Sequence, residues 1–251
     1  MNLYETDRLL SEYLLFHYGT PEEVLPPAFA PLSPREALGF AERAVAETFE
    51  REPSERALDL GCAVGRSSFE LARFSREVVG IDFSRRFIDA ARALQRTGAI
   101  GYARVDEGTL TTPLTARVPE GIERERVLFE TGDAMALRDD LGTFDRVLAA
   151  NLLCRLGEPR RCLERLPSLV RPGGQLVITT PCTWMDEFTP RDHWLGGVER
   201  AGIRVTTLAS LRDALEPAFE LCRSADLPFL IREHARKYQW SVAQASIWRR
   251  R

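Results

Sequence analysis

The chain has 251 residues, of which 44% are hydrophobic, and its formal net charge is only −3. This length suits one large α/β domain or two small ones, and the hydrophobic share excludes a disordered chain. The slightly acidic balance, without a long basic run, disfavours a nucleic-acid-binding protein. No apolar stretch approaches the ~18–20 residues of a membrane span, and the N-terminus lacks a signal-peptide core. We therefore expect a cytoplasmic protein without a membrane partner.

Cysteine and histidine usage argues against a metal centre. The five cysteines include no CxxC pair, and the three histidines show no metal-ligand spacing. An odd, scattered set of cysteines is atypical of disulfide scaffolds and of zinc sites. We therefore expect no metal cofactor.

The first fifty residues predict a helical lid. Residues 4–18 place apolar side chains on one face of a helix, and a proline-rich loop follows. Ser33-Pro34-Arg35-Glu36 is a capping box with proline at the first helical position, which predicts a helix that continues to about Glu50.

Strand and helix signals alternate from residue 56 onward. Strands are expected at 56–60, 77–81, 127–131, 144–150 and 175–180, and helices at 65–74, 84–97 and 159–171. Repeated βα units predict a mostly parallel sheet with helices on both faces.

Two segments depart from this alternation of strands and helices. Residues 101–118 alternate polar and apolar around the turn Glu107-Gly108, which predicts an inserted β-hairpin. Residues 218–225 and 239–248 predict a final antiparallel pair, separated by a loop at Pro228. The expected fold is α/β, a single domain over 1–251, with the lid at 1–50 and a Rossmann-like core of seven strands at 56–251.

A glycine-containing turn joins the first strand to its helix. Residues 56–60 lead directly into Gly61-Cys62-Ala63-Val64-Gly65. Glycines at such a turn let the backbone approach a ligand, and the helix N-terminus offers free N–H groups. The same turn serves dinucleotides, but Ala63 stands where their second glycine admits the pyrophosphate.

Acidic residues mark the ends of three strands. Asp59 precedes the glycines, Asp82 ends the second strand, and Asp133 follows the third. Open α/β sheets bind ligands at the carboxyl ends of their strands. Each acid alone could be an ordinary surface or capping residue, and the ordered set of three is what indicates a nucleotide-like ligand.

Residues 56–181 resemble the class I S-adenosylmethionine-dependent methyltransferases. Phe144–Asn151 resembles their fourth-strand motif, and Arg171-Pro172-Gly173-Gly174 resembles the turn before their fifth strand. The resemblance implies S-adenosylmethionine as cofactor and S-adenosylhomocysteine as product. It places Asp59 beside the cofactor's amino group, Asp82 at the ribose and Asp133 at the adenine. The implied cofactor-binding residues are Asp59, Gly61, Cys62, Gly65, Asp82, Phe83, Gly132, Asp133, Ala134 and Asn151.

The flanks resemble a narrower family, the methyltransferase domain of ovothiol biosynthesis, a 4-mercaptohistidine N1-methyltransferase. The similar segments are residues 4–19, 180–197 and 232–250. The resemblance implies methyl transfer to a ring nitrogen of 5-thiohistidine, which gives ovothiol A. Many members are fused behind an iron-dependent sulfoxide synthase. Because this chain begins at Met1, we expect a separately encoded synthase to supply the thiohistidine.

The substrate's thiolate is a stronger nucleophile than its ring nitrogen, so the site needs a donor that holds the sulfur away from the methyl group. The α-carboxylate suits an arginine, and a neutral histidine or a carboxylate could accept the ring proton. The catalytic candidates are Tyr13, His17, Asn151 and Glu187. The substrate-binding candidates are Tyr18, Trp184, Arg191, Trp194, Arg232 and His234, with Lys237 also considered.

Each candidate has a structural alternative. Tyr13 could be a core residue and His17 a packed or capping one. The two tryptophans could pack a loop, Glu187 and Arg191 could form a surface pair, and His234 could lie on a solvated face.

Two other functions remain open from the sequence. One is methylation of another small amino acid or imidazole-type metabolite. The other is a cofactor-binding partner that regulates a sulfoxide synthase without catalysis of its own. The intact acids and glycines of the cofactor turn argue against the second.

Overall fold

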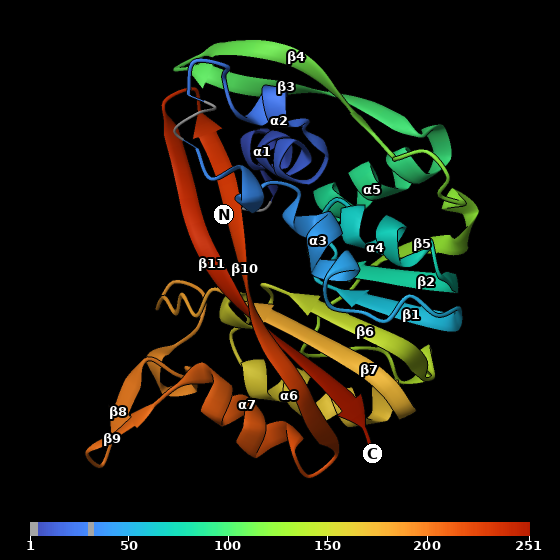
Figure 1. Cartoon of the computed structure of the whole chain (residues 1–251), viewed down its shortest axis with the longest axis vertical. Helices are drawn as coiled ribbons and strands as arrows, with labels where there is room; N and C mark the ends of the chain where they lie inside the picture. The colour runs from blue at the N-terminus through green and yellow to red at the C-terminus, as the bar shows by residue number, and fades with distance from the viewer. Residues whose placement is uncertain (1–4, 30–32) are drawn as a thin grey trace.

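The computed structural model describes residues 5–29 and 33–251, and its centre is a seven-stranded sheet in the order β10-β11-β7-β6-β1-β2-β5 (Figure 1). The strands are β1 (Ser54–Leu60), β2 (Ser75–Asp82), β5 (Val127–Thr131), β6 (Phe144–Ala150), β7 (Val170–Thr180), β10 (Phe219–His234) and β11 (Lys237–Arg250). All neighbours pair in parallel except β11, which is antiparallel to both β7 and β10. The predicted mostly parallel sheet with an antiparallel last strand is confirmed.

Both faces of the sheet are covered, and successive strand residues alternate between two cores. In β1, Ala57 packs into one core while Leu58 and Leu60 pack into the other. This period of two is what a strand buried on both faces requires. The first core is shared with α1 (Asp7–Tyr18), α3 (Phe40–Ala46), α4 (Arg66–Leu71) and α5 (Arg85–Thr97), and the second with α6 (Pro159–Leu169) and α7 (Thr207–Leu215).

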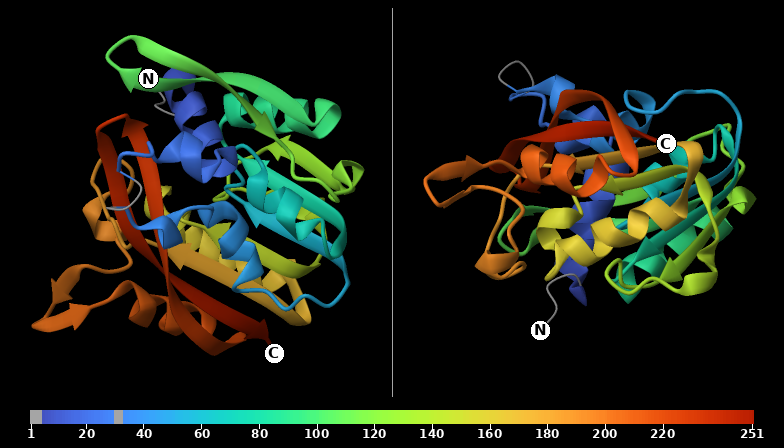
Figure 2. Two further views of the ribbon diagram at one scale, coloured as in Figure 1. Left: turned by 45° about the horizontal axis from the view of Figure 1, so that its top comes forward. Right: turned by 90° about the horizontal axis from the view of Figure 1, so that it is seen from below.

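Two long hairpins extend beyond the sheet and enclose α1. The predicted insertion forms β3 (Ala99–Glu107) and β4 (Leu110–Arg117), with its turn at the predicted position. The β10–β11 hairpin reaches past the sheet toward it, and α1 contacts both β3 and β10 (Figures 1 and 2). A third hairpin, β8 (Val198–Arg200) and β9 (Ile203–Val205), projects from the opposite end.

Two predicted boundaries are wrong. The expected helix from Ser33 to Glu50 is divided into a 3₁₀ turn at Arg35–Ala37 and α3, because Gly39 adopts φ +64°. Ser33 does not cap it, since its hydroxyl donates to the carbonyl of Phe29. The expected loop at Pro228 is instead part of β10, where Pro228 pairs with Val242. Proline is tolerated there because β10 is an edge strand and its missing N–H costs no ladder bond.

Residues 5–29 and 33–251 contain neither a membrane-spanning helix nor a metal-binding cluster. None of their helices is long and apolar enough to cross a membrane. No group of three or more His, Cys, Asp or Glu side chains among them is placed to hold a metal ion.

Candidate functional site

A cavity of about 740 Å³ lies at the carboxyl ends of β1, β2, β5 and β6. The glycine turn and the strand-end acids form one side of it. The helix α1 and strand β10 contribute the other side, through Tyr13, His17, Phe229 and Ile231. The lid and the sheet edge therefore enclose one common space, although they are far apart in the chain.

The turn after β1 is built for close approach of a ligand. Gly61, Ala63 and Gly65 all have positive φ, at 73°, 48° and 86°. A Cβ at Gly65 would lie 2.5 Å from the Phe129 ring, so that position needs glycine for both φ and packing. Gly61 lines the cavity and Gly65 does not. Ala63 keeps the turn in place through its N–H, which donates to Asp82 Oδ2 at 2.9 Å.

Asp59 is a buried acid on the cavity wall. The Ser68 hydroxyl donates to its Oδ2 at 2.6 Å. Burial raises the pKa of Asp59 to about 7, and the Ser68 hydrogen bond only partly offsets this rise. A buried carboxyl with such a pKa is stabilised in its charged form by a cation. This position therefore fits the ammonium group that the resemblance assigns to it.

Asp82 and Asp133 complete the acidic side of the cavity. Asp82 accepts the N–H groups of Ala63 and Ser84, and burial raises its pKa. Asp133 Oδ1 accepts the Met135 N–H at 2.8 Å. Each carboxylate keeps lone pairs for a ligand. Cys62, Phe83, Gly132 and Ala134 also line this side, and burial raises the pKa of the Cys62 thiol.

The four predicted catalytic candidates, Tyr13, His17, Asn151 and Glu187, all line the same cavity. Tyr13 packs its ring 4.7 Å from that of Phe87. Burial, then the charge of Arg66, lowers the pKa of His17 to about 3, so its imidazole is neutral. Its Nδ1 is buried and has no hydrogen-bond partner in the described part of the chain. These positions are compatible with substrate contact, and the roles stay predictions.

The predicted substrate-binding residues do not line this cavity. Tyr18 donates its hydroxyl to the carbonyl of Val64, within the glycine turn. Trp184 bonds Thr207 and Trp194 bonds the carbonyl of Thr189, so both pack the loop after β7. Arg191 is exposed and lies over the Trp194 ring.

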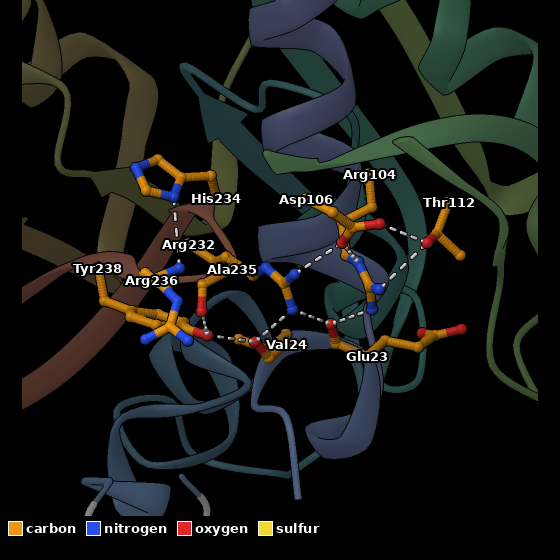
Figure 3. A network of polar contacts seen from close by, with 10 residues as sticks. All are labelled: Glu23, Val24, Arg104, Asp106, Thr112, Arg232, His234, Ala235, Arg236 and Tyr238. Atoms are coloured by element: carbon orange, nitrogen blue, oxygen red, sulfur yellow. Dashed lines mark hydrogen bonds and ion pairs between the residues drawn. The ribbon is translucent and has the colours of Figure 1, made fainter. Parts of the chain in front are cut away.

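Arg232 and His234 belong to a separate polar network (Figure 3). The Arg232 guanidinium donates to the carbonyls of Glu23 and Val24 and to Asp106 Oδ1. His234 accepts the N–H of Arg236 through Nδ1. Lys237 pairs with Glu233. The structure thus places these residues where α2 (Pro21–Val24), β3 and the β10–β11 turn meet, and not in the cavity.

Arg155 is the cavity-lining cation that the sequence prediction missed. Its guanidinium lies 4.6 Å from the Phe188 ring centroid, and Nη1 donates to the carbonyls of Cys154 and Thr183. No carboxylate of the described residues pairs with it. The missed aromatic and apolar wall residues include Phe16, Phe40, Phe188, Phe229 and Ile231. The sequence did contain a signal for Arg155: it lies four residues after Asn151, which marks the end of a central strand.

Comparisons with known proteins agree with this geometry. Residues 34–218 match the family model described as methyltransferase domain. An O-methyltransferase of Penicillium expansum, cnsE, is 26% identical over 69% of this chain and 60% of its own length. The methyltransferase GfsG of Streptomyces halstedii is 29% identical over 55% of this chain and 42% of its own length. The chain therefore spans less than two thirds of either relative.

Solved structures share the fold. The N-methyltransferase NodS of Bradyrhizobium japonicum WM9, in complex with S-adenosyl-L-homocysteine, has a TM-score of 0.55 at 16% identity and covers 98% of both chains. The [4+2]-cyclase SpnF has a TM-score of 0.59 at 18% identity, covering 99% of this chain and 94% of its own. At these identities the likeness establishes the fold alone.

Proposed function

Because the chain belongs to the S-adenosylmethionine-dependent methyltransferases, we propose that it methylates a ring nitrogen of 5-thiohistidine (4-mercaptohistidine) to give ovothiol A. In this proposal residues 1–251 form one catalytic unit, and a sulfoxide synthase supplies the thiohistidine. The resemblance of the lid, of the loop after β7 and of the tail to the ovothiol family supports it.

One observation carries the choice of substrate class. The cavity that the acids line is also lined by aromatic side chains, such as Phe16, Phe40 and Phe229, and by Arg155, whose guanidinium has no carboxylate partner among the described residues. A flat ring packs well against aromatic side chains. A carboxylate is the partner that a guanidinium group binds best, through charge-assisted hydrogen bonds. A heteroaromatic amino acid presents both groups.

In the proposed reaction, different residues of the chain bind the cofactor and the substrate. When bound, S-adenosylmethionine supplies the sulfonium methyl group: its bond to sulfur breaks, the electron pair stays on sulfur, and the ring nitrogen forms the new bond. Asp59 holds the cationic amino group, and the aromatic wall aligns the ring. Arg155 binds the substrate carboxylate, and Glu187 lies exposed on the cavity wall, where it can meet the ring.

The proton that the ring loses goes to Glu187 or to water in this proposal. His17 is a poor proton acceptor, because burial lowers its pKa to about 3. Its neutral ring acts instead as a hydrogen-bonding wall of the substrate pocket.

A direct assay tests the proposal. Purified protein is incubated with S-adenosylmethionine and either 5-thiohistidine or histidine, and the products are analysed by mass spectrometry. Gain of one methyl group only on thiohistidine, mapped to a ring nitrogen, is the expected result. Methylation of a different imidazole or amino acid, or weak cofactor binding combined with tight binding to a sulfoxide synthase, would overturn it.

A further inference from the structure

Three hydrogen bonds join Asn151, which directly follows β6, to Thr179 in the neighbouring strand β7. Its backbone N–H lies 2.9 Å from the Thr179 carbonyl oxygen and 3.0 Å from Thr179 Oγ1. The Thr179 hydroxyl in turn donates to Asn151 Oδ1 at 2.9 Å. Thr179 is fully buried, and Asn151 has φ +52°, a left-handed conformation that asparagine tolerates better than most residues. The contact therefore fixes both the backbone and the side chain.

The hydrogen-bond pattern determines which way the amide of Asn151 faces. The Thr179 hydroxyl has one proton, and its oxygen already accepts the Asn151 backbone N–H. With Oδ1 toward Thr179, that proton has an acceptor. With the amide reversed, Oγ1 would face two donors and its own proton would lose this partner. The amide nitrogen is thus turned away from Thr179, and no acceptor within residues 5–29 and 33–251 bonds it.

We infer that Thr179 is a positioning residue, which holds Asn151 so that its amide N–H donors face the substrate and bind the thiolate sulfur. This inference rests on the proposed function. Asn151 lines the same cavity as Asp59 and Asp82 at the carboxyl ends of β1 and β2 and as the lid residues of α1. Sulfur is a stronger nucleophile than the ring nitrogen, and N–H donors bound to it lower its reactivity. The Thr179–Asn151 pair therefore selects nitrogen over sulfur as the methyl acceptor.

The test compares Thr179→Val, which removes the hydroxyl at nearly constant volume, with Thr179→Ser, which retains it. The measured quantity is the ratio of S-methylated to N-methylated thiohistidine. We expect Thr179→Val to raise this ratio by about tenfold, the loss of one oriented hydrogen bond, and Thr179→Ser to keep the wild-type ratio. The dissociation constant for S-adenosylhomocysteine should stay unchanged. A lower rate at constant product ratio would overturn the inference, because general destabilisation alone produces that result.

A second measurement is independent of turnover. The side-chain amide signals of Asn151, assigned by their loss in Asn151→Asp, are recorded by NMR with S-adenosylhomocysteine bound. They should shift in Thr179→Val and remain in place in Thr179→Ser. Unchanged signals in Thr179→Val would overturn the orientation. Failure of the wild type to methylate thiohistidine would overturn the proposed function and the sulfur assignment together, while the NMR result would still decide the orientation.

Discussion

The hydroxyl of Tyr18 donates a hydrogen bond to the carbonyl oxygen of Val64 at 2.8 Å, and so joins the last turn of α1 to the glycine turn after β1. These residues are 46 positions apart in the chain. This hydrogen bond links the lid to the predicted cofactor turn. Ordering of one of these elements should therefore favour ordering of the other.

Removal of this hydroxyl should weaken cofactor binding. We expect Tyr18→Phe to destabilise the fold by about 1 kcal/mol, the usual net value of one hydrogen bond, and to raise the dissociation constant for S-adenosylmethionine severalfold. Calorimetric titration and thermal unfolding measure the two effects. Tyr102→Phe is the matched control, since the buried Tyr102 hydroxyl has no partner among the described residues. Equal losses in both variants would show that the Tyr18 bond contributes nothing specific.

Cofactor affinity should depend on the protonation of Asp59. Its pKa is about 7 in the free protein, and a bound ammonium group favours the ionised carboxylate. Binding below that pH therefore releases a proton, so affinity should rise by up to about tenfold per pH unit toward neutrality and level off above it. Isothermal titration between pH 5 and 8 measures this slope. Asp59→Asn should bind more weakly, with a shallower profile over the same range, because Asp82 still titrates in the cavity with a raised pKa.

The same raised pKa has the opposite consequence for stability without ligand. The pKa of this carboxyl is near the usual 3.8 in the unfolded chain and about 7 in the folded protein. The folded state therefore binds more protons between these values, and its unfolding free energy should fall as pH rises through them. An Asp59→Asn variant that retained this part of the pH dependence would contradict the assignment.

The cofactor side of the cavity was predictable because local rules determine it. Neighbouring parallel strands end at one edge of a sheet, so residues at the carboxyl ends of β1, β2 and β5 must lie close together. Asp59, Asp82 and Asp133 could thus be placed on one cavity from their positions at or just after the carboxyl ends of apolar strands.

The substrate side could not be predicted in this way, because long-range contacts determine it. Arg232 had the right chemistry for a carboxylate, but Asp106, 126 residues away on the inserted hairpin, already pairs with it. Phe229 reaches the cavity because residues around Pro228 form an edge strand, where the sequence predicted a loop. Periodicity in one segment contains no information about such partners.

Arg155 should contribute to substrate binding through the α-carboxylate. We expect Arg155→Ala to lower kcat/KM for thiohistidine by about tenfold to a hundredfold, as for loss of a charged hydrogen bond, mainly through KM. Arg191→Ala is the matched control, because that arginine is exposed and does not line the cavity. A thioimidazole without the carboxylate should be methylated equally by wild type and Arg155→Ala. A selective loss on that analogue would assign Arg155 another role.

The network around Asp106 should hold the two hairpins against α2. Asp106 accepts hydrogen bonds from Arg104, Arg232 and Thr112, and the side chain of Arg232 is only 2% exposed. Asp106→Asn leaves that buried guanidinium without its counter-charge. Because Asp106 is itself 27% exposed, water screens part of the loss, and we expect about 2–3 kcal/mol of destabilisation rather than the larger value of a fully buried pair.

Denaturant unfolding at several pH values measures the unfolding free energy. The control is Glu77→Gln, which removes an exposed ion pair with Arg56 and should change the unfolding free energy little. Burial raises the pKa of Asp106, but the hydrogen bonds from Thr112 and Arg104 outweigh it, so the net pKa is lowered. The stabilisation is therefore complete above the unfolded pKa and lost as pH falls through the folded one. Asp106→Asn should remove this acid-sensitive component. If the unfolding free energy of Asp106→Asn still falls at low pH as in the wild type, the network does not hold the hairpins against α2.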